Sequence, residues 1–144
     1  MFENSLVQLS LNLYSGSRLL IQRIQAALQD SGLTYPQFLA LSILWKEDGL
    51  KVHELGHHLN LDSGTLTPLL KKLEAQNLLK RKRGEEDERT VSIHLTYPGK
   101  SLQTKTMEAI ALLEQELIEE MGEEFNRILP VSEAFLEKLN TLKK

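Results

Sequence analysis

Two adjoining stretches decide the fold: D-S-G-T-L-T-P-L-L-K-K-L-E at residues 62–74, and L-L-K-R-K-R-G-E-E-D-E-R-T-V-S-I-H-L-T at residues 78–96. The first begins with polar capping residues and continues with apolar residues three and four apart, which is typical of an amphipathic helix. The second contains two β-like runs, residues 78–83 and 90–95, and the later run alternates apolar and polar side chains. The polar residues 84–89 between them predict a hairpin turn. Together the stretches predict a helix followed by a two-stranded hairpin.

Helical patterns flank these stretches on both sides. Apolar residues three and four positions apart run from residue 6 to residue 28, and T-Y-P at residues 34–36 is typical of a capped helix start. A short helix is predicted at residues 51–59. A long helix follows Pro98, and a last helix is predicted from Ser132 onwards.

This order of elements predicts one mainly α domain of the α+β winged-helix type. Residues 33–98 form a winged helix-turn-helix, in which a turn joins the short helix to the capped helix and the hairpin is the wing. Residues 1–31 and 99–144 supply long N- and C-terminal helices. Because these outer helices are too long and too apolar for so small a domain to bury, we expect them to be the dimerisation helices of a homodimer.

The composition excludes several classes of protein. The chain has no cysteine, which rules out disulfides, cysteine-based zinc sites and thiol redox sensing. No stretch approaches the roughly 20 apolar residues of a membrane span. The N-terminal sequence M-F-E-N-S-L-V-Q-L lacks the basic region of a secretory signal. We therefore expect a cytoplasmic protein without a membrane partner.

The residues His53-Glu54-x-x-His57 match the pattern in which two histidines one helical turn apart bind zinc and a glutamate acts as a base. A zinc hydrolase needs a third protein ligand as well. Of the other histidines, His58 lies on a different helix face and His94 falls in the wing. We therefore expect no metal, no cofactor and no enzymatic activity, and a zinc hydrolase stays a remote alternative.

A basic cluster stands out in a chain whose formal net charge is −3. Within residues 71–83 the six basic side chains are offset only by Glu74, and they are Lys71, Lys72, Lys80, Arg81, Lys82 and Arg83. Such a cluster is either the electrostatic footprint of a polyanion site or a solvated, lysine-rich helix end.

The two opening stretches, together with L-T-Y-P-Q-F-L-A-L-S-I-L-W at residues 33–45 and L-Y-S-G-S-R at residues 13–18, resemble the MarR family of transcriptional regulators. Within that family they resemble the organic-hydroperoxide-resistance, or OhrR-type, branch. The motifs cover residues 6–100, and the helix pattern covers the rest. The resemblance implies a homodimer that binds double-stranded DNA at a palindromic, A/T-rich inverted repeat, as a repressor related to peroxide-responsive regulators.

The capped helix corresponds to the recognition helix of such a regulator. Ser63, Thr65 and Thr67 lie at its N-terminal end, which enters the major groove, where hydroxyl groups can bond base edges or phosphates. Lys71 and Lys72 lie two turns further on and are expected to contact phosphates or base edges at the rim of the groove.

In the wing, the resemblance implies that Arg89 reaches into the minor groove and that Asp87 orients it. A narrow A/T-rich minor groove has an enhanced negative potential, which attracts an inserted arginine. Arg81, Lys82 and Arg83 are expected to flank this contact on the DNA backbone.

The sequence departs from the resemblance at the sensor. OhrR-type regulators carry a reactive cysteine four residues before a tyrosine, and here Ser10 precedes Tyr14 at that spacing. A serine hydroxyl cannot be oxidised to a sulfenic acid. Tyr14 and Tyr35 stay as candidate hydrogen-bonding groups around an effector pocket. Ser10 is therefore either an engineered replacement that locks the DNA-binding state, or part of a protein that responds to a small non-oxidant effector.

Overall fold

The computed structural model describes residues 3–87 and 90–142, and it confirms a mainly helical fold with a small antiparallel hairpin. The elements in chain order are α1 (Ser5–Ala27), a 3-10 turn η1 (Gln29–Ser31), α2 (Tyr35–Lys46), α3 (Val52–Leu59), α4 (Ser63–Ala75), β1 (Leu79–Arg83), β2 (Val91–Leu95), α5 (Tyr97–Met121) and α6 (Glu123–Thr141).

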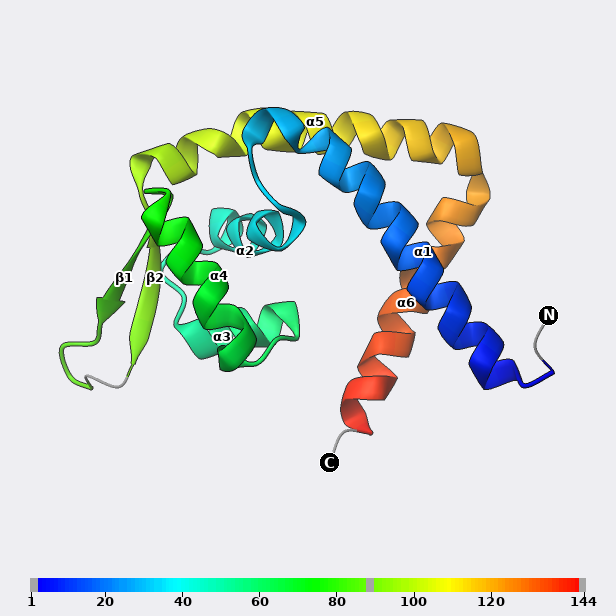
Figure 1. Cartoon of the computed structure of the whole chain (residues 1–144), viewed down its shortest axis with the longest axis horizontal. Coiled ribbons are helices and arrows are strands. Elements are labelled where there is room, and N and C mark those ends of the chain that lie inside the picture. Colours follow the sequence, from blue (N-terminus) through cyan, green and yellow to red (C-terminus); the bar gives the residue numbers. More distant parts are fainter. Residues whose placement is uncertain (1–2, 88–89, 143–144) are drawn as a thin grey trace.

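The helix α5 runs along one edge of the molecule and joins its two parts (Figure 1). The elements α2, α3, α4 and the β1–β2 hairpin gather beneath its N-terminal half. The helices α1 and α6 run away from its C-terminal half as two arms (Figure 1). An ion pair between Arg23 of α1 and Glu120 of α5, with an N–O distance of 3.2 Å, links one arm to this helix.

The hydrophobic core lies almost entirely in the winged part of the molecule. The inner face of α4 buries three leucines at helical spacing, and α2 is buried on most of its circumference, as its apolar sequence predicts. The large core side chains are Leu28, Phe38, Leu41, Leu44, Leu55, Leu66, Leu70, Leu73, Leu79 and Ile93. This core fixes the orientation of α4 relative to the wing.

The wing is held from two sides. In the hairpin, Leu79 pairs with Leu95 and Arg83 pairs with Val91. The chain before α3 adds a further contact, because the Ile93 amide donates a hydrogen bond of 2.7 Å to the Leu50 carbonyl oxygen. The base of the hairpin is therefore attached to the helix-turn-helix.

Two glutamine side chains connect α1 to α2 and α2 to α4. Gln25 of α1 donates a hydrogen bond of 2.9 Å to the Leu33 carbonyl oxygen and accepts one of 2.8 Å from the Tyr35 amide. Gln37 of α2 is buried, accepts from the Thr34 amide and donates to the side chain of Gln76 at the end of α4. The capped start predicted for α2 is thus also a junction between three helices.

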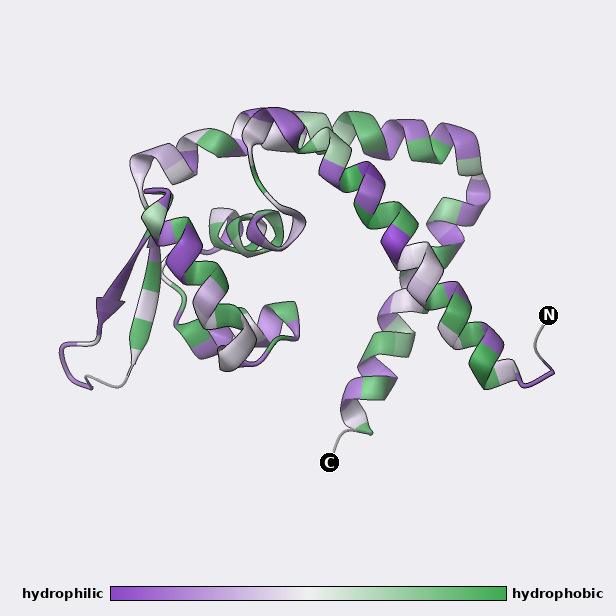
Figure 2. Ribbon diagram, in the orientation of Figure 1, coloured by the Kyte–Doolittle hydropathy of each residue, from purple (hydrophilic) through white to green (hydrophobic). Residues whose placement is uncertain are grey.

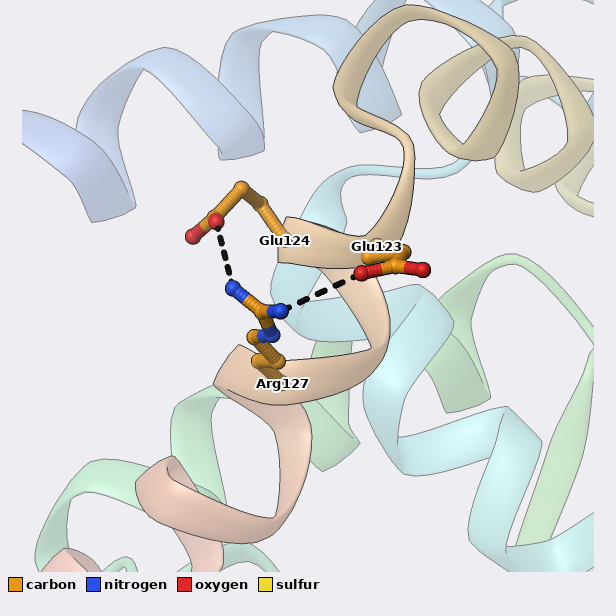
Figure 3. Close-up of polar contacts among 3 residues, drawn as sticks. All are labelled: Glu123, Glu124 and Arg127. Carbon is orange, nitrogen blue, oxygen red and sulfur yellow. Dashed lines mark hydrogen bonds and ion pairs between the residues drawn. The ribbon is translucent and has the colours of Figure 1, made fainter.

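The predicted start of the last helix, Ser132, was wrong. The helix α6 begins at Glu123, directly after Gly122 turns the chain with a φ of 61°, and it continues through Pro130. Arg127 donates to the carboxylates of Glu123 and Glu124 at 3.1 and 3.2 Å and ties the first turn together (Figure 3). Proline removes one helical hydrogen bond, yet the helix runs past it.

Apolar residues occur along the whole length of both arms (Figure 2), and many of their side chains are exposed. On α1 they recur at helical spacing and include Leu6, Leu9, Leu13 and Leu20. On α6 and just after it they cover much of the surface and include Ile128, Phe135, Leu139 and Leu142. Contiguous apolar surface of this kind marks an interaction site. None of the described helices is both long and apolar enough to cross a membrane.

Candidate nucleic-acid interface

The cap and the buried face of α4 place its polar N-terminal end on the surface. The Asp62 carboxylate accepts a hydrogen bond of 2.7 Å from the Thr65 amide and fixes the first turn. Because Leu66, Leu70 and Leu73 face the core, the predicted contact residues lie elsewhere on the helix. Ser63, Thr65, Lys71 and Lys72 are all exposed.

Thr67 differs from the other predicted contacts on α4. Its side chain is half-buried, and its hydroxyl group donates a hydrogen bond of 2.7 Å to the Ser63 carbonyl oxygen. The Thr67 hydroxyl is therefore engaged within the helix as a donor, and its oxygen keeps only its acceptor capacity toward other groups.

A close backbone approach sets the turn between α3 and α4. The Leu61 amide donates a hydrogen bond of 2.9 Å to the Gly56 carbonyl oxygen, after Asn60 ends α3 with a φ of 57°. A Cβ atom on Gly56 would lie 2.7 Å from the Leu61 carbonyl oxygen, so only glycine fits. The sequence alone did not predict this role of Gly56 in the turn.

The residues that match the zinc-binding pattern lie on α3, where the glutamate has a structural role. The Glu54 carboxylate accepts a hydrogen bond of 3.0 Å from the Lys51 amide and caps α3, rather than standing free as a base. His53 and His57 are exposed. Among residues 3–87 and 90–142, no three side chains of the metal-ligating types come together.

The wing tip is a tight polar loop. The Gly84 amide donates to the Thr90 carbonyl oxygen at 2.8 Å, and the Asp87 carbonyl oxygen accepts from both the amide and the hydroxyl group of Thr90. Lys82 and Arg83 are exposed at the end of β1. The tip lies at the same end of the molecule as the N-terminal end of α4 (Figure 1). The predicted minor-groove residue, Arg89, lies outside the described residues.

Arg81 has a role that the sequence did not predict. Its guanidinium Nε and Nη2 atoms lie 3.1 Å from Glu74 Oε1, and its backbone amide donates to Glu74 Oε2 at 3.2 Å. These hydrogen bonds, above all the backbone one, and the arginine charge lower the pKa of the Glu74 carboxyl, against the opposing effect of burial. Arg81 was predicted to flank DNA, and in the structure it is held by the recognition helix.

Known proteins with this architecture identify the family. Residues 22–109 match the family model described as transcriptional regulator SarA/Rot. The organic hydroperoxide resistance transcriptional regulator of Bacillus subtilis strain 168 is 41% identical over 133 residues, which are 92% of this chain and 90% of that protein. The chain belongs to the MarR/SarA family of winged-helix transcriptional regulators.

Solved structures of this family agree with the assignment. The crystal structure of AbfR of Staphylococcus epidermidis is 36% identical, with a TM-score of 0.70, over 90% of this chain and 92% of that one. A structure of reduced AbfR bound to DNA gives the same identity and TM-score, over 85% and 92% of the two chains. The family and the relatives of this regulator are transcriptional regulators rather than enzymes.

The predicted sensor residues of the regulator lie in two separate places. Ser10 is exposed on α1, and its hydroxyl group donates to the Val7 carbonyl oxygen at 2.8 Å. Tyr14 is 68% exposed, and the Arg18 guanidinium carbon lies 6.0 Å from its ring centroid. Tyr35 is half-buried at the start of α2, where burial raises the pKa of its phenol.

A pocket lined by Ser10, Tyr14 and Tyr35 together is not formed within one chain. The Tyr35 amide contacts Gln25, which is 25 − 10 = 15 residues from Ser10 along α1. At 1.5 Å per residue, Ser10 lies about 22 Å away along the helix. The sequence pattern could not separate these residues, because their distance depends on where α2 joins α1.

Proposed function

We propose that this regulator binds double-stranded DNA as a homodimer and represses transcription from a palindromic, A/T-rich operator. The observation that carries the proposal is the common orientation of the N-terminal end of α4 and the wing tip (Figure 1). The first presents Ser63 and Thr65 to a major groove, and the second presents Lys82 and Arg83 to the backbone beside a minor groove. AbfR, which has the same fold, has been solved bound to DNA.

DNA binding and dimerisation are assigned to different parts of the chain from the distribution of buried and exposed apolar side chains. Residues 33–98 contain most of the core and form the DNA-binding part. Residues 1–31 and 99–144 form the dimerisation part, which the exposed apolar surface of α1 and α6 supports. In a symmetric dimer the two recognition helices contact half-sites about one helical turn apart.

Within the wing, Arg89 is proposed as the residue that enters the minor groove, with Asp87 as the residue that orients it. The hydrogen bonds of Thr90 to the Asp87 carbonyl oxygen support this proposal, because they fix Asp87 and Thr90, which lie on either side of position 89 in the sequence.

Lys71→Ala and Lys72→Ala are each expected to lower the affinity for a duplex selected from a random-sequence library by about tenfold. Each substitution removes one phosphate contact from both subunits, so the slope of log affinity against log salt should become shallower by about two. Lys100→Ala is the matched control, because Lys100 is equally exposed but lies on α5, beyond the base of the wing. Binding that shows no dependence on salt would contradict the proposal.

Organic hydroperoxide is expected to leave DNA binding by this regulator unchanged, because Ser10 and the rest of the chain provide no thiol to oxidise. The measurement is operator affinity before and after stoichiometric peroxide. Release of DNA by the unaltered protein would show that another group senses the oxidant. Peroxide-dependent release of DNA by Ser10→Cys, but not by the unaltered protein, would show that position 10 is a sensor site without its thiol. Continued DNA binding by both proteins would favour a small non-oxidant effector.

Effector binding is proposed to act by moving the two winged parts as rigid bodies. The glutamine junctions at Gln25 and Gln37 link α1 to α2 and α2 to α4, so a displacement of the arms is carried to the recognition helix. A change in the spacing of the two recognition helices then mismatches the operator half-sites.

A further inference from the structure

Glu74 is the one acidic side chain on the recognition helix, and an acidic side chain on a DNA-binding helix normally opposes binding. It lies in the last turn of α4, and only three residues, 76–78, separate the end of α4 from β1. Its two carboxylate oxygens both engage Arg81, one through the guanidinium group and the other through the backbone amide.

The backbone contact is informative because of the strand register. Arg81 pairs with Ile93 across the hairpin, yet its amide donates to Glu74 rather than to β2. Glu74 therefore covers an outward-facing amide on an edge strand, which would otherwise be open to water or to another strand. The carboxylate contacts the strand as well as the arginine charge, and so holds the backbone of the wing.

We propose that Glu74 and Arg81 are a positioning pair that fixes the wing relative to the recognition helix, so that the major-groove and minor-groove contacts form together. This inference rests on the proposed function. Arg81 then holds the wing in position within the protein instead of contacting the DNA backbone.

The length of the wing makes the orientation of its strands important. Arg81 is the third of the five residues of β1, and Arg83 at the end of the strand lies about 7 Å beyond it at 3.4 Å per residue. A rotation of about 10° about Arg81 moves the end of β1 by about 1 Å, roughly a third of the length of a hydrogen bond, and moves the tip beyond it further. Two hydrogen bonds and a salt bridge at the middle of β1 therefore bear directly on whether the tip reaches its groove.

The charge state of the pair suits this role. Because the pKa of Glu74 is lowered in the folded protein, its contribution to stability is complete above the ordinary carboxyl pKa and is lost as the pH falls through the folded-state value. Glu74 therefore carries its negative charge near neutral pH, where it pairs with the Arg81 guanidinium group.

The deciding variant is Glu74→Gln, which keeps the shape of the side chain and removes a negative charge from a DNA-binding helix. If the negative charge of Glu74 only repelled DNA, the affinity of Glu74→Gln for the duplex selected by the unaltered protein would stay equal or increase. The positioning role instead predicts an affinity lower by about five- to twentyfold. Glu86→Gln is the control, since Glu86 is an exposed acid of the wing for which the described residues provide no ion pair, and its binding should not weaken.

Arg81 is tested by a double-mutant cycle. If Arg81 positions the wing through Glu74, Arg81→Ala and Glu74→Ala weaken binding by similar amounts, and the Glu74→Ala/Arg81→Ala double variant binds about as well as either single variant. If Arg81 instead contacts phosphate independently of Glu74, the losses of the two single variants add in the double variant. Hydrogen exchange at the Arg81 amide gives a second measurement without DNA, and its protection should fall in Glu74→Gln while the core amides stay protected.

The two proposals fail in different ways. If the unaltered protein selects no duplex, the proposed function is overturned and the inference falls with it. If the unaltered protein binds a duplex but Glu74→Gln binds equally well or more tightly, or the losses of Glu74→Ala and Arg81→Ala add in the double variant, only the positioning role is overturned. Weaker binding by Glu74→Gln, with a double variant that binds about as well as either single variant, supports it.

Discussion

Replacing Gly99 by alanine is expected to lower the free energy of unfolding by about 2–4 kcal/mol. Gly99 is buried in the first turn of α5, and a Cβ atom there would overlap the carbonyl oxygen of Leu78. That oxygen accepts a hydrogen bond of 3.2 Å from the Thr96 amide, and the Gly99 carbonyl oxygen accepts one of 2.9 Å from Trp45 Nε1. A shift of α5 that relieved the overlap would lengthen both bonds.

Urea denaturation followed by circular dichroism measures this effect. Gly64→Ala is the matched control, because Gly64 also lies in the first turn of a helix but a Cβ atom there meets only ordinary contacts, the nearest at 3.6 Å. The control should be neutral or stabilising, since alanine is the better helix former. Equal stability of the two variants would show that the Leu78 backbone moves aside at little cost.

Replacing Leu13 by glutamate is expected to dissociate the proposed homodimer and to lower operator affinity by about a hundredfold or more. Leu13 is 49% exposed in one chain, so the glutamate costs the single chain little. In a symmetric interface the substitution buries two carboxylates at once. Each separated subunit then binds only half of a palindrome.

Sedimentation at micromolar protein concentration measures the dissociation, and the selected duplex measures the loss of affinity. Asn12→Glu is the control, because it places the same carboxylate at the neighbouring position, where the sequence is already polar. A dimeric Leu13→Glu protein would place the interface away from this face of α1. Unchanged circular dichroism is expected for both variants.

The elements set by local chemistry were predicted well from the sequence. T-Y-P over residues 34–36 predicted a capped helix, and the structure shows reciprocal hydrogen bonds between Thr34 and Gln37, a partner that the sequence did not predict. The polar residues at 62 and 63 likewise predicted a cap for α4, and Asp62 is the one that forms it. The alternation over residues 90–95 predicted a strand whose central residue, Ile93, is fully buried. In each case residues within four positions of one another determine the outcome.

The features that the sequence could not predict depend on distance in space rather than in sequence. The pairing of Arg81 with Glu74 requires the angle between α4 and β1, so the sequence did not predict it, and a contact of Arg81 with the DNA backbone stays a prediction. Ser10 and Tyr35 were grouped by resemblance, and within one chain α1 holds them apart.

The junction of α1, α2 and α4 has a chemical consequence of its own. Gln25 and Gln37 each use one amide group as donor and acceptor at the same time. Amides do not titrate, so these links keep the same strength across the physiological range of acidity and respond little to dissolved ions. Binding to DNA weakens with salt, whereas the connection proposed to carry a signal to the recognition helix does not. Glutamate or lysine at either position would give the connection a charge, and the transmitted response would then change with the composition of the surrounding solution.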